Sequence, residues 1–214
     1  MSLFYDMKFI AISDTHGQHH KLHLPEGDCI IHAGDVSKMG KHFEIIDFLE
    51  WFKQLDFEHK IFIAGNHDFW FEQATQIEIK KMIPENIIYL NDSGILINGI
   101  QIWGSPITPW FYDWAFNRQR GEEIKKHWDL IPANTDILIT HGPVHGILDR
   151  TTSNDHAGCE DLKNQVEIVK PKVHICGHIH EGYGMIEKEE TLFINASVLN
   201  VKYELVNEVV EFEM

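Results

Sequence analysis

Residues 8–17 read KFIAISDTHG, and this stretch indicates how the 214-residue chain folds. Its first part, residues 8–13, is a short apolar run rich in residues that favour β-structure, and Asp14 and His16 follow directly. A buried strand that carries polar side chains at its carboxyl end has this pattern. We therefore expect a strand over residues 8–13 and a functional loop immediately after it.

Four later segments repeat the pattern of a short apolar run followed by Asp, Asn, His or Gly. They are residues 28–33 before GD, 60–64 before GNHD, 136–140 before HGP and 172–176 before GHIH. Helix-like stretches lie between them at residues 41–54, 72–82 and 120–127, and the first has Phe43, Ile46, Leu49 and Phe52 near helical spacing. This alternation predicts an α/β core. Ligands bind outside the carboxyl ends of strands in such sheets, so the five polar clusters should converge on one crevice.

The remaining segments predict a hairpin and a second sheet. Residues 95–103, ILINGIQIW, have Asn98 and Gly99 at their centre, a dipeptide that favours a two-residue turn. Residues 183–188, 191–195 and 198–213 suggest strands of a second, more antiparallel sheet packed on the first, which gives a layered α/β sandwich. The chain has no linker, low-complexity tract or internal repeat, so we expect one domain over residues 1–214.

Composition limits the classes of function. The formal charge of −15 opposes binding to the phosphate backbone, so no long nucleic acid is expected as a partner. A small phosphorylated substrate is compatible with this charge, because bound cations reverse the field locally. Three cysteines without a CxxC pair indicate a reducing cytoplasm. No apolar run approaches the ~20 residues that span a bilayer, so no membrane partner is expected.

Metal-binding residue types gather at the ends of the predicted strands. Imidazole, carboxylate and amide groups are metal ligands, and a carboxylate such as that of Asp35 can bridge two cations. Each motif alone fits an ordinary turn, cap or structural histidine, but five in order, each after a buried strand, favour a metal site. The candidate ligands are Asp14, His16, Asp35, Asn66, His141, His178 and His180. Seven histidines outside these motifs are instead expected to be solvated or to cap nearby backbone. They are His19, His20, His23, His42, His59, His127 and His174.

The order DTH, GD, GNHD, HG and GHIH between residues 14 and 180 resembles that of the calcineurin-like metallophosphoesterases. Residues 104–117, 136–143, 176–184 and 193–197 (FINAS) resemble the metallophosphoesterase-domain-containing branch, a relative of class III cyclic-nucleotide phosphodiesterases. The resemblance implies an α/β/β/α sandwich of two mixed sheets and a dinuclear site that holds Mn, Fe or Zn. It implies one ion at Asp14, His16, Asp35 and His180, and a second at Asp35, Asn66, His141 and His178.

The expected reaction is hydrolysis of a phosphoric ester, with a hydroxide that bridges the two ions as the nucleophile. His67 is the candidate catalytic residue that donates a proton to the leaving oxygen, and its rival role is to support the metal loop. Asp68 either orients His67 or caps a helix that begins near Phe69. The chain has only three arginines and none in the GDVSKMG motif, so the forked clamp typical of monoester sites is missing and diesters are favoured.

Several alternatives stay open at this point. The aromatic residues within 103–116 form either a wall for a nucleobase or a core or dimer contact. A phosphomonoesterase or a nuclease could use the same site. A non-catalytic, metal-dependent binding or scaffold protein is the rival from another class, because a fold does not prove turnover. The physiological substrate, the native metal pair and a homodimeric state are not determined by the sequence.

Overall fold

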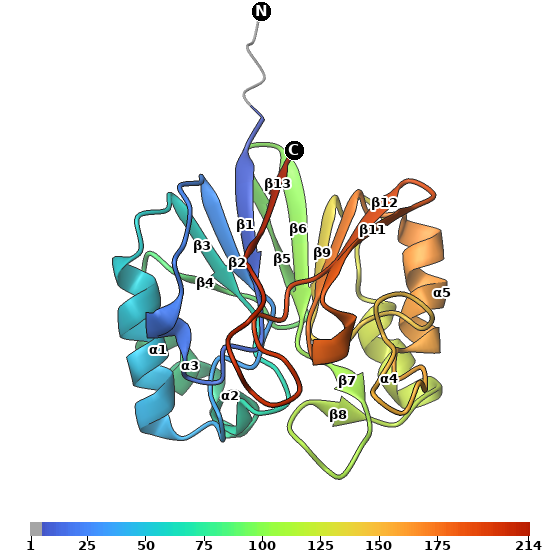
Figure 1. Ribbon diagram of the computed structural model, residues 1–214, viewed down its shortest axis with the longest axis horizontal. Coiled ribbons are helices and arrows are strands. Elements are labelled where there is room, and N and C mark those ends of the chain that lie inside the picture. The colour runs from blue at the N-terminus through green and yellow to red at the C-terminus, as the bar shows by residue number, and fades with distance from the viewer. Residues whose placement is uncertain (1–5) are drawn as a thin grey trace, which may run out of the picture.

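The computed structural model describes residues 6–214, and two β-sheets lie face to face at its centre (Figure 1). In the first sheet four strands are parallel, and the outer strand β13 runs antiparallel to β1. Its strands in spatial order are β13 (Val210–Glu213), β1 (Lys8–Ile12), β2 (Cys29–His32), β3 (His59–Phe62) and β4 (Ile88–Tyr89).

The second sheet has four parallel strands at its centre and an antiparallel strand at each edge. In spatial order the strands are β11 (Gly184–Lys188), β12 (Thr191–Asn195), β10 (Val173–Cys176), β9 (Ile137–Thr140), β6 (Ile100–Ser105) and β5 (Ser93–Ile97). A separate parallel pair is formed by β7 (Thr108–Pro109) and β8 (Asn117–Arg118). Both large sheets are therefore mixed, as expected.

Helices cover the outer face of each sheet, so the layers run α/β/β/α and the expected fold class is confirmed (Figure 1). The helices beside the first sheet are α1 (His42–Gln54), α2 (Phe69–Gln73) and α3 (Gln76–Met82). Those beside the second are α4 (Glu122–Trp128) and α5 (Glu160–Val169). Two 3-10 turns, η1 (His19–Lys21) and η2 (His180–Gly182), follow β1 and β10. No helix among residues 6–214 is both long and apolar enough to cross a membrane.

Alternation along the strands builds the core between the sheets. Phe9 and Ile31 point inward from the first sheet and meet Ile139 and Ile175 of the second. The intervening residues, such as Ile10, pack outward against the helices. Because successive strand residues face opposite sides, a strand covered on both faces needs a continuous apolar run. This is why the strands read as uninterrupted apolar stretches in the sequence.

The five strands that carry the polar motifs do not share one sheet. This corrects the expectation that their polar ends lie along the edge of a single sheet. β1, β2 and β3 belong to the first sheet, whereas β9 and β10 belong to the second. Backbone hydrogen bonds join the sheets at their carboxyl ends: Ser13 donates to Ala196 at 2.8 Å, and Val198 donates to Ser13 at 3.1 Å. The five strand ends therefore still meet at one place.

Three segments differ from their predicted form. The predicted helix 72–82 is two helices, because Thr75 forms a capping box with Glu78 that starts α3. The predicted strand 198–213 contains only β13, which pairs with β1 in the first sheet rather than in the second. Helix α5 was not predicted. The hairpin is confirmed, with φ of 49° at Asn98 and 87° at Gly99.

Helix α1 buries Leu49 and Phe52 as the sequence indicated, but the rest of its buried face differs from the predicted one. Ile45, Phe48, Leu49 and Phe52 are buried, whereas Phe43 is 66% exposed and Ile46 is 40% exposed. A spacing of three residues falls short of a turn of about 3.6 residues, so a run in threes drifts around the helix. The stripe that starts at Ile45 keeps to one side because it alternates steps of three and four.

This difference gives a matched test on one helix. Phe48→Ala should lower the free energy of unfolding by about 3–5 kcal/mol, because it leaves a cavity against β2 and β3. Phe43→Ala removes the same atoms from an exposed position and should change the free energy of unfolding by no more than about 0.5 kcal/mol. Urea titration followed by circular dichroism measures both, and comparable losses would contradict the assigned face.

Candidate metal centre

The seven predicted ligands and His67 come together where the carboxyl ends of the two sheets meet. A cavity of about 220 Å³ opens there. Asp14 and His141 lie behind its wall with no solvent exposure. The residues that line it are His16, Asp35, Asn66, His67, Phe111, Trp114, His178, His180 and Tyr203.

The predicted ligands form two neighbouring groups, and a further group of His16, Asp35 and His67 shares one member with each of them. Asp14, His16 and His180 make the first, in which His180 Nε2 lies 3.5 Å from Asp14 Oδ1. Asp35, His141 and His178 make the second. In each group all ligand atoms lie within 4.8 Å of one another. Either group could hold a metal ion by the spacing of its ligand atoms.

Asp35 lies between the two groups. Its Oδ2 atom is 3.6 Å from His16 Nε2 in the first group and 3.3 Å from His141 Nε2 in the second. The amide of Asn66 reaches the second group as well, because its Oδ1 is 3.0 Å from His141 Nε2. Asp35 is thus the residue of this set whose carboxylate lies near both groups of ligand atoms.

Backbone carbonyls fix the orientation of four of the histidine rings. In each case the Nδ1–H donates to a carbonyl oxygen, which leaves Nε2 directed toward the other ligands. A ligand histidine commonly has such a partner, because it sets the tautomer and the plane of the ring. The pairs are His16 with Ser37 at 3.2 Å, His67 with Lys38 at 2.6 Å, His141 with Ala33 at 2.9 Å, and His180 with Asn200 at 2.9 Å.

An independent observation also indicates that these residues suit a metal ion. His16 Nε2 is buried and has no hydrogen-bond partner among residues 6–214. A buried polar atom without a partner is costly, and a cation would satisfy it. Imidazole, carboxylate and amide donors together suit Mn²⁺, Fe and Zn²⁺.

The buried carboxylates and imidazoles of the site stabilise one another's charged forms. Burial alone would raise the pKa of Asp14, but the hydrogen bond and positive charge of His180 hold it well below its usual range. Burial would lower the pKa of His141, but the carboxylate of Asp35 outweighs it and raises the value to about 9. In the same way, the hydrogen bond and charge of Asp14 outweigh burial and raise the pKa of His180 to about 9. A bound cation would take the place of these imidazole protons beside the carboxylates.

Four of the candidate ligands have left-handed backbone conformation. Asp14, His16, Asp35 and His178 have φ of 55°, 43°, 57° and 67°. The left-handed region is uncommon for such residues and is found at functional sites. Gly177 lies against Asp14, and a Cβ at this position would overlap the Asp14 carboxylate and Ser13 Oγ. This contact explains why a glycine precedes His178.

Asp68 has neither of the roles considered from the sequence. It stands at the start of α2, but its side chain makes no capping hydrogen bond. Its carboxylate instead accepts from the backbone N–H groups of Val36, Ser37 and Gly65 and from the Ser37 hydroxyl. Burial, followed by the charge of Asp35, raises the pKa of Asp68 to about 6. Asp68 therefore ties the Asp35 loop to the Asn66 loop, and it does not orient His67.

Two of the histidines expected to be solvated or capping are buried. His174 faces outward from β10 under the α4 and α5 layer, and its Nε2 lies 2.8 Å from Thr140 Oγ1. Burial lowers the pKa of His174 to about 3. His19 is fully buried against α1. Their positions were missed because a lone histidine in a sequence carries no signal of burial.

Other contributors come from segments without a motif. Ser197, within FINAS, donates its hydroxyl hydrogen bond to Asp14 Oδ2. Tyr203 lines the cavity from the loop before β13, with its ring 4.9 Å from that of His16. In the aromatic segment, Phe111 and Trp114 line the cavity. No sequence signal pointed to Tyr203, whereas the FINAS resemblance pointed to Ser197 without giving its role.

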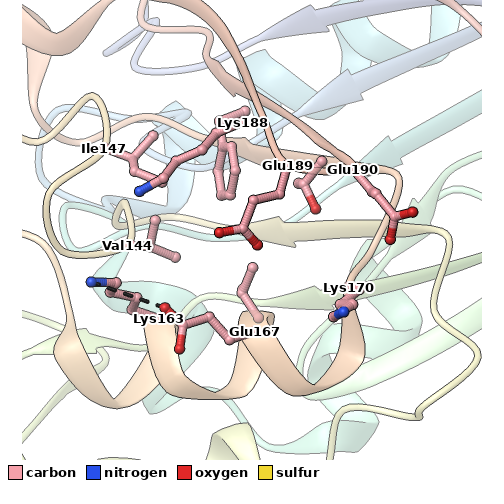
Figure 2. A pocket seen from close by; sticks show the side chains of 11 residues that line it. Val144, Ile147, Lys163, Glu167, Lys170, Lys188, Glu189 and Glu190 are labelled. Carbon is pink, nitrogen blue, oxygen red and sulfur yellow. Dashed lines mark ion pairs between the residues drawn. The ribbon is translucent and has the colours of Figure 1, made fainter.

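A second cavity lies away from these residues, between α5 and the β11–β12 hairpin (Figure 2). It measures about 370 Å³ and combines an apolar floor, which includes Val144 and Ile147, with a charged rim. Lys163 and Glu167 of α5 form an ion pair at 4.0 Å on this rim. None of the predicted ligands lines it, so its size does not make it the catalytic cavity.

Comparison with known proteins identifies the family of this chain. The family described as calcineurin-like phosphoesterase matches residues 7–182. Metallophosphoesterase domain-containing protein 1 of Homo sapiens is 41% identical over 223 residues, which cover 94% of this chain and 68% of that protein. A UPF0046 protein of Caenorhabditis elegans is 37% identical over 206 residues, which cover 91% of this chain and 70% of that protein.

A solved structure agrees with the fold. The phosphopantetheinyl hydrolase of Mycobacterium tuberculosis superposes with a TM-score of 0.63 and covers 92% of this chain and 91% of its own, at 14% identity. At this identity the likeness concerns the fold alone. From the family match and the relatives above 35% identity, we conclude that the chain belongs to the calcineurin-like phosphoesterase family, in the branch of metallophosphoesterase-domain-containing proteins.

Proposed function

We propose that this metal-dependent phosphoesterase holds two metal ions and cleaves small phosphodiesters. The observation that carries the proposal is the position of Asp35 between two groups of ligand atoms. The cavity of about 220 Å³ suits a small substrate, and the charge of −15 disfavours a long nucleic acid. A nuclease is for this reason the weaker alternative.

The ligand assignment follows the two groups. When bound, a pair of Mn, Fe or Zn ions supplies an activated water and neutralises charge that develops on the phosphoryl oxygens. This chain's residues hold the ions and orient the ester. Asp14, His16, Asp35 and His180 would hold one ion, and Asp35, Asn66, His141 and His178 the other.

His67 is placed to give a proton to the leaving oxygen. Its Nδ1–H donates to the Lys38 carbonyl, so Nε2 faces the cavity. On the cavity side, His67 Nε2 lies 4.0 Å from Asp35 Oδ2, beside the ligand groups. The Trp114 ring packs against His67 with centroids 4.3 Å apart, which restricts rotation of the imidazole.

The arginines support the preference for diesters. Arg118 pairs with Glu72 at 3.1 Å, Arg120 donates to backbone carbonyls of residues 157 and 158, and Arg150 donates to Asn154. None of them lines the cavity. A dianionic monoester is best held by a forked guanidinium, and a monoanionic diester needs it less.

One observation favours phosphomonoesters as a second candidate. Lys21 and Lys38 line a hollow that adjoins the cavity and shares His16, His67 and Tyr203 with it. Ammonium groups bind phosphate as point charges, so they could hold a terminal phosphate without the guanidinium fork. The relative rates on the two ester classes decide between the candidates.

The first prediction concerns metal removal. Protein stripped with EDTA should lose hydrolysis of bis(p-nitrophenyl) phosphate and of 2′,3′- and 3′,5′-cyclic AMP, and Mn²⁺ should restore it. Asp35→Ala should stay inactive after Mn²⁺ is added, because it removes the carboxylate shared by the two groups. Faster turnover of p-nitrophenyl phosphate would indicate a monoesterase. Bound metal without turnover of any ester would favour the non-catalytic binding protein.

The second prediction separates the two roles of His67. His67→Gln should lower kcat about 10²- to 10⁴-fold, the usual contribution of a general acid, while the metal content per chain stays that of the unaltered protein. If His67 only supports the metal loop, the variant should lose metal together with activity. Metal analysis beside steady-state kinetics distinguishes these results.

The third prediction concerns the aromatic residues. We expect Phe111, whose ring lies 5.1 Å from that of His178, to contact the base of a nucleotide diester. Phe111→Ala should raise the KM for cyclic AMP by roughly tenfold, and it should raise the KM for methyl p-nitrophenyl phosphate less. Trp110→Ala is the matched control, because Trp110 is 47% exposed and does not line the cavity. Equal changes for both diesters would exclude base stacking.

A further inference from the structure

Another group of metal-ligating side chains lies outside the catalytic cavity, on the outer side of the first sheet. His19 and His20 of η1 meet Asp47 of α1. His19 Nε2 is 3.2 Å from Asp47 Oδ2, and His20 Nε2 is 3.1 Å from Asp47 Oδ1. The three ligand atoms lie within 4.8 Å of one another. None of the three residues lines the catalytic cavity.

The buried member of this group lacks a hydrogen bond. His19 is fully buried, and neither of its ring nitrogens has a hydrogen-bond partner within residues 6–214. His20 differs from it, because His20 Nε2 forms a hydrogen bond of 3.1 Å with Asp47 Oδ1. Burial, together with the neighbouring His20, lowers the pKa of His19 to about 4, so its ring is neutral near pH 7. A neutral imidazole that points an unpaired nitrogen at a carboxylate has the form of a ligand rather than of an ion pair.

We propose that His19, His20 and Asp47 bind a third divalent transition-metal ion, of which Zn²⁺ is the best match. Two imidazoles and one carboxylate form a donor set that zinc prefers, with the fourth position left to water. Bonds of ~2.1 Å in a tetrahedron place the ligand atoms ~3.4 Å apart. His19 Nε2 and His20 Nε2 lie 3.2 Å and 3.1 Å from the two different oxygens of Asp47, so each nitrogen is near this distance from one possible ligand atom.

The consequence is a cross-link between two elements. η1 directly follows the loop that carries Asp14 and His16, whereas Asp47 belongs to the helix that covers the same sheet. A Zn²⁺ ion at this point would fasten the turn after the first ligand loop to α1. The site is separate from the catalytic one, so its occupancy can be tested without reference to hydrolysis.

Zinc stoichiometry tests the proposal directly. His20→Gln and Asp47→Asn alter side chains that are 56% and 54% exposed, so both proteins should fold. Each variant, compared with the unaltered full chain in equilibrium dialysis against Zn²⁺, should bind one ion fewer or bind that ion at least about tenfold more weakly. His42→Gln is the matched control on α1, because His42 is also exposed but does not belong to the group. It should bind as many ions as the unaltered protein.

Trp51 provides a local optical readout. Its ring lies 4.9 Å from that of His19, so a paramagnetic Co²⁺ ion bound there should quench its fluorescence. Subtracting the emission of a Trp51→Phe protein isolates this signal from the other tryptophans. Quenching should occur in the unaltered chain and be lost in Asp47→Asn. Unchanged Zn²⁺ stoichiometry and affinity in both variants, with equal Co²⁺ quenching, would overturn the proposal.

Discussion

The backbone hydrogen bonds of Ser13 with Ala196 and Val198 are the constraint on which the rest of the site depends. They join the carboxyl end of β1 in one sheet to the segment that follows β12 in the other. Without this junction, the ligands of the first sheet, such as Asp35, would not face those of the second, such as His141. The junction also places Ser197 beside Asp14, where its hydroxyl orients the carboxylate.

The loops that carry the candidate ligands combine uncommon backbone conformations with tight packing. Non-glycine residues take the left-handed conformation at four ligand positions, and Gly177 leaves no room for a side chain. Buried carboxylates and imidazoles offset one another in charge, and backbone carbonyls hold the rings in one orientation. Strain, burial and charge are therefore concentrated in the same few loops, where a cation would relieve the electrostatic part of their cost.

Much of the fold and the set of site residues could be predicted, because both depend on local patterns. Strand residues such as Phe9 and Ile31 lie in continuous apolar runs, and a polar motif at the end of a run marks the edge where ligands bind. The buried stripe of α1 could not be located, because Phe43 and Phe48 are chemically alike and only packing separates them. Asp68 was misread for a similar reason: a residue at a helix start resembles a cap unless its distant partners are known.

The sequence by itself determined that this chain is an α/β protein, which polar residues are the candidate ligands and to which family it belongs, because strand periodicity and motif order are properties of neighbouring residues. Only the tertiary structure decided which sheet each strand joins and how Asp35 lies between two groups of ligands. It alone revealed Tyr203 at the cavity and the group of His19, His20 and Asp47. Contacts between residues far apart in the chain depend on how the layers pack, and no local pattern encodes that packing.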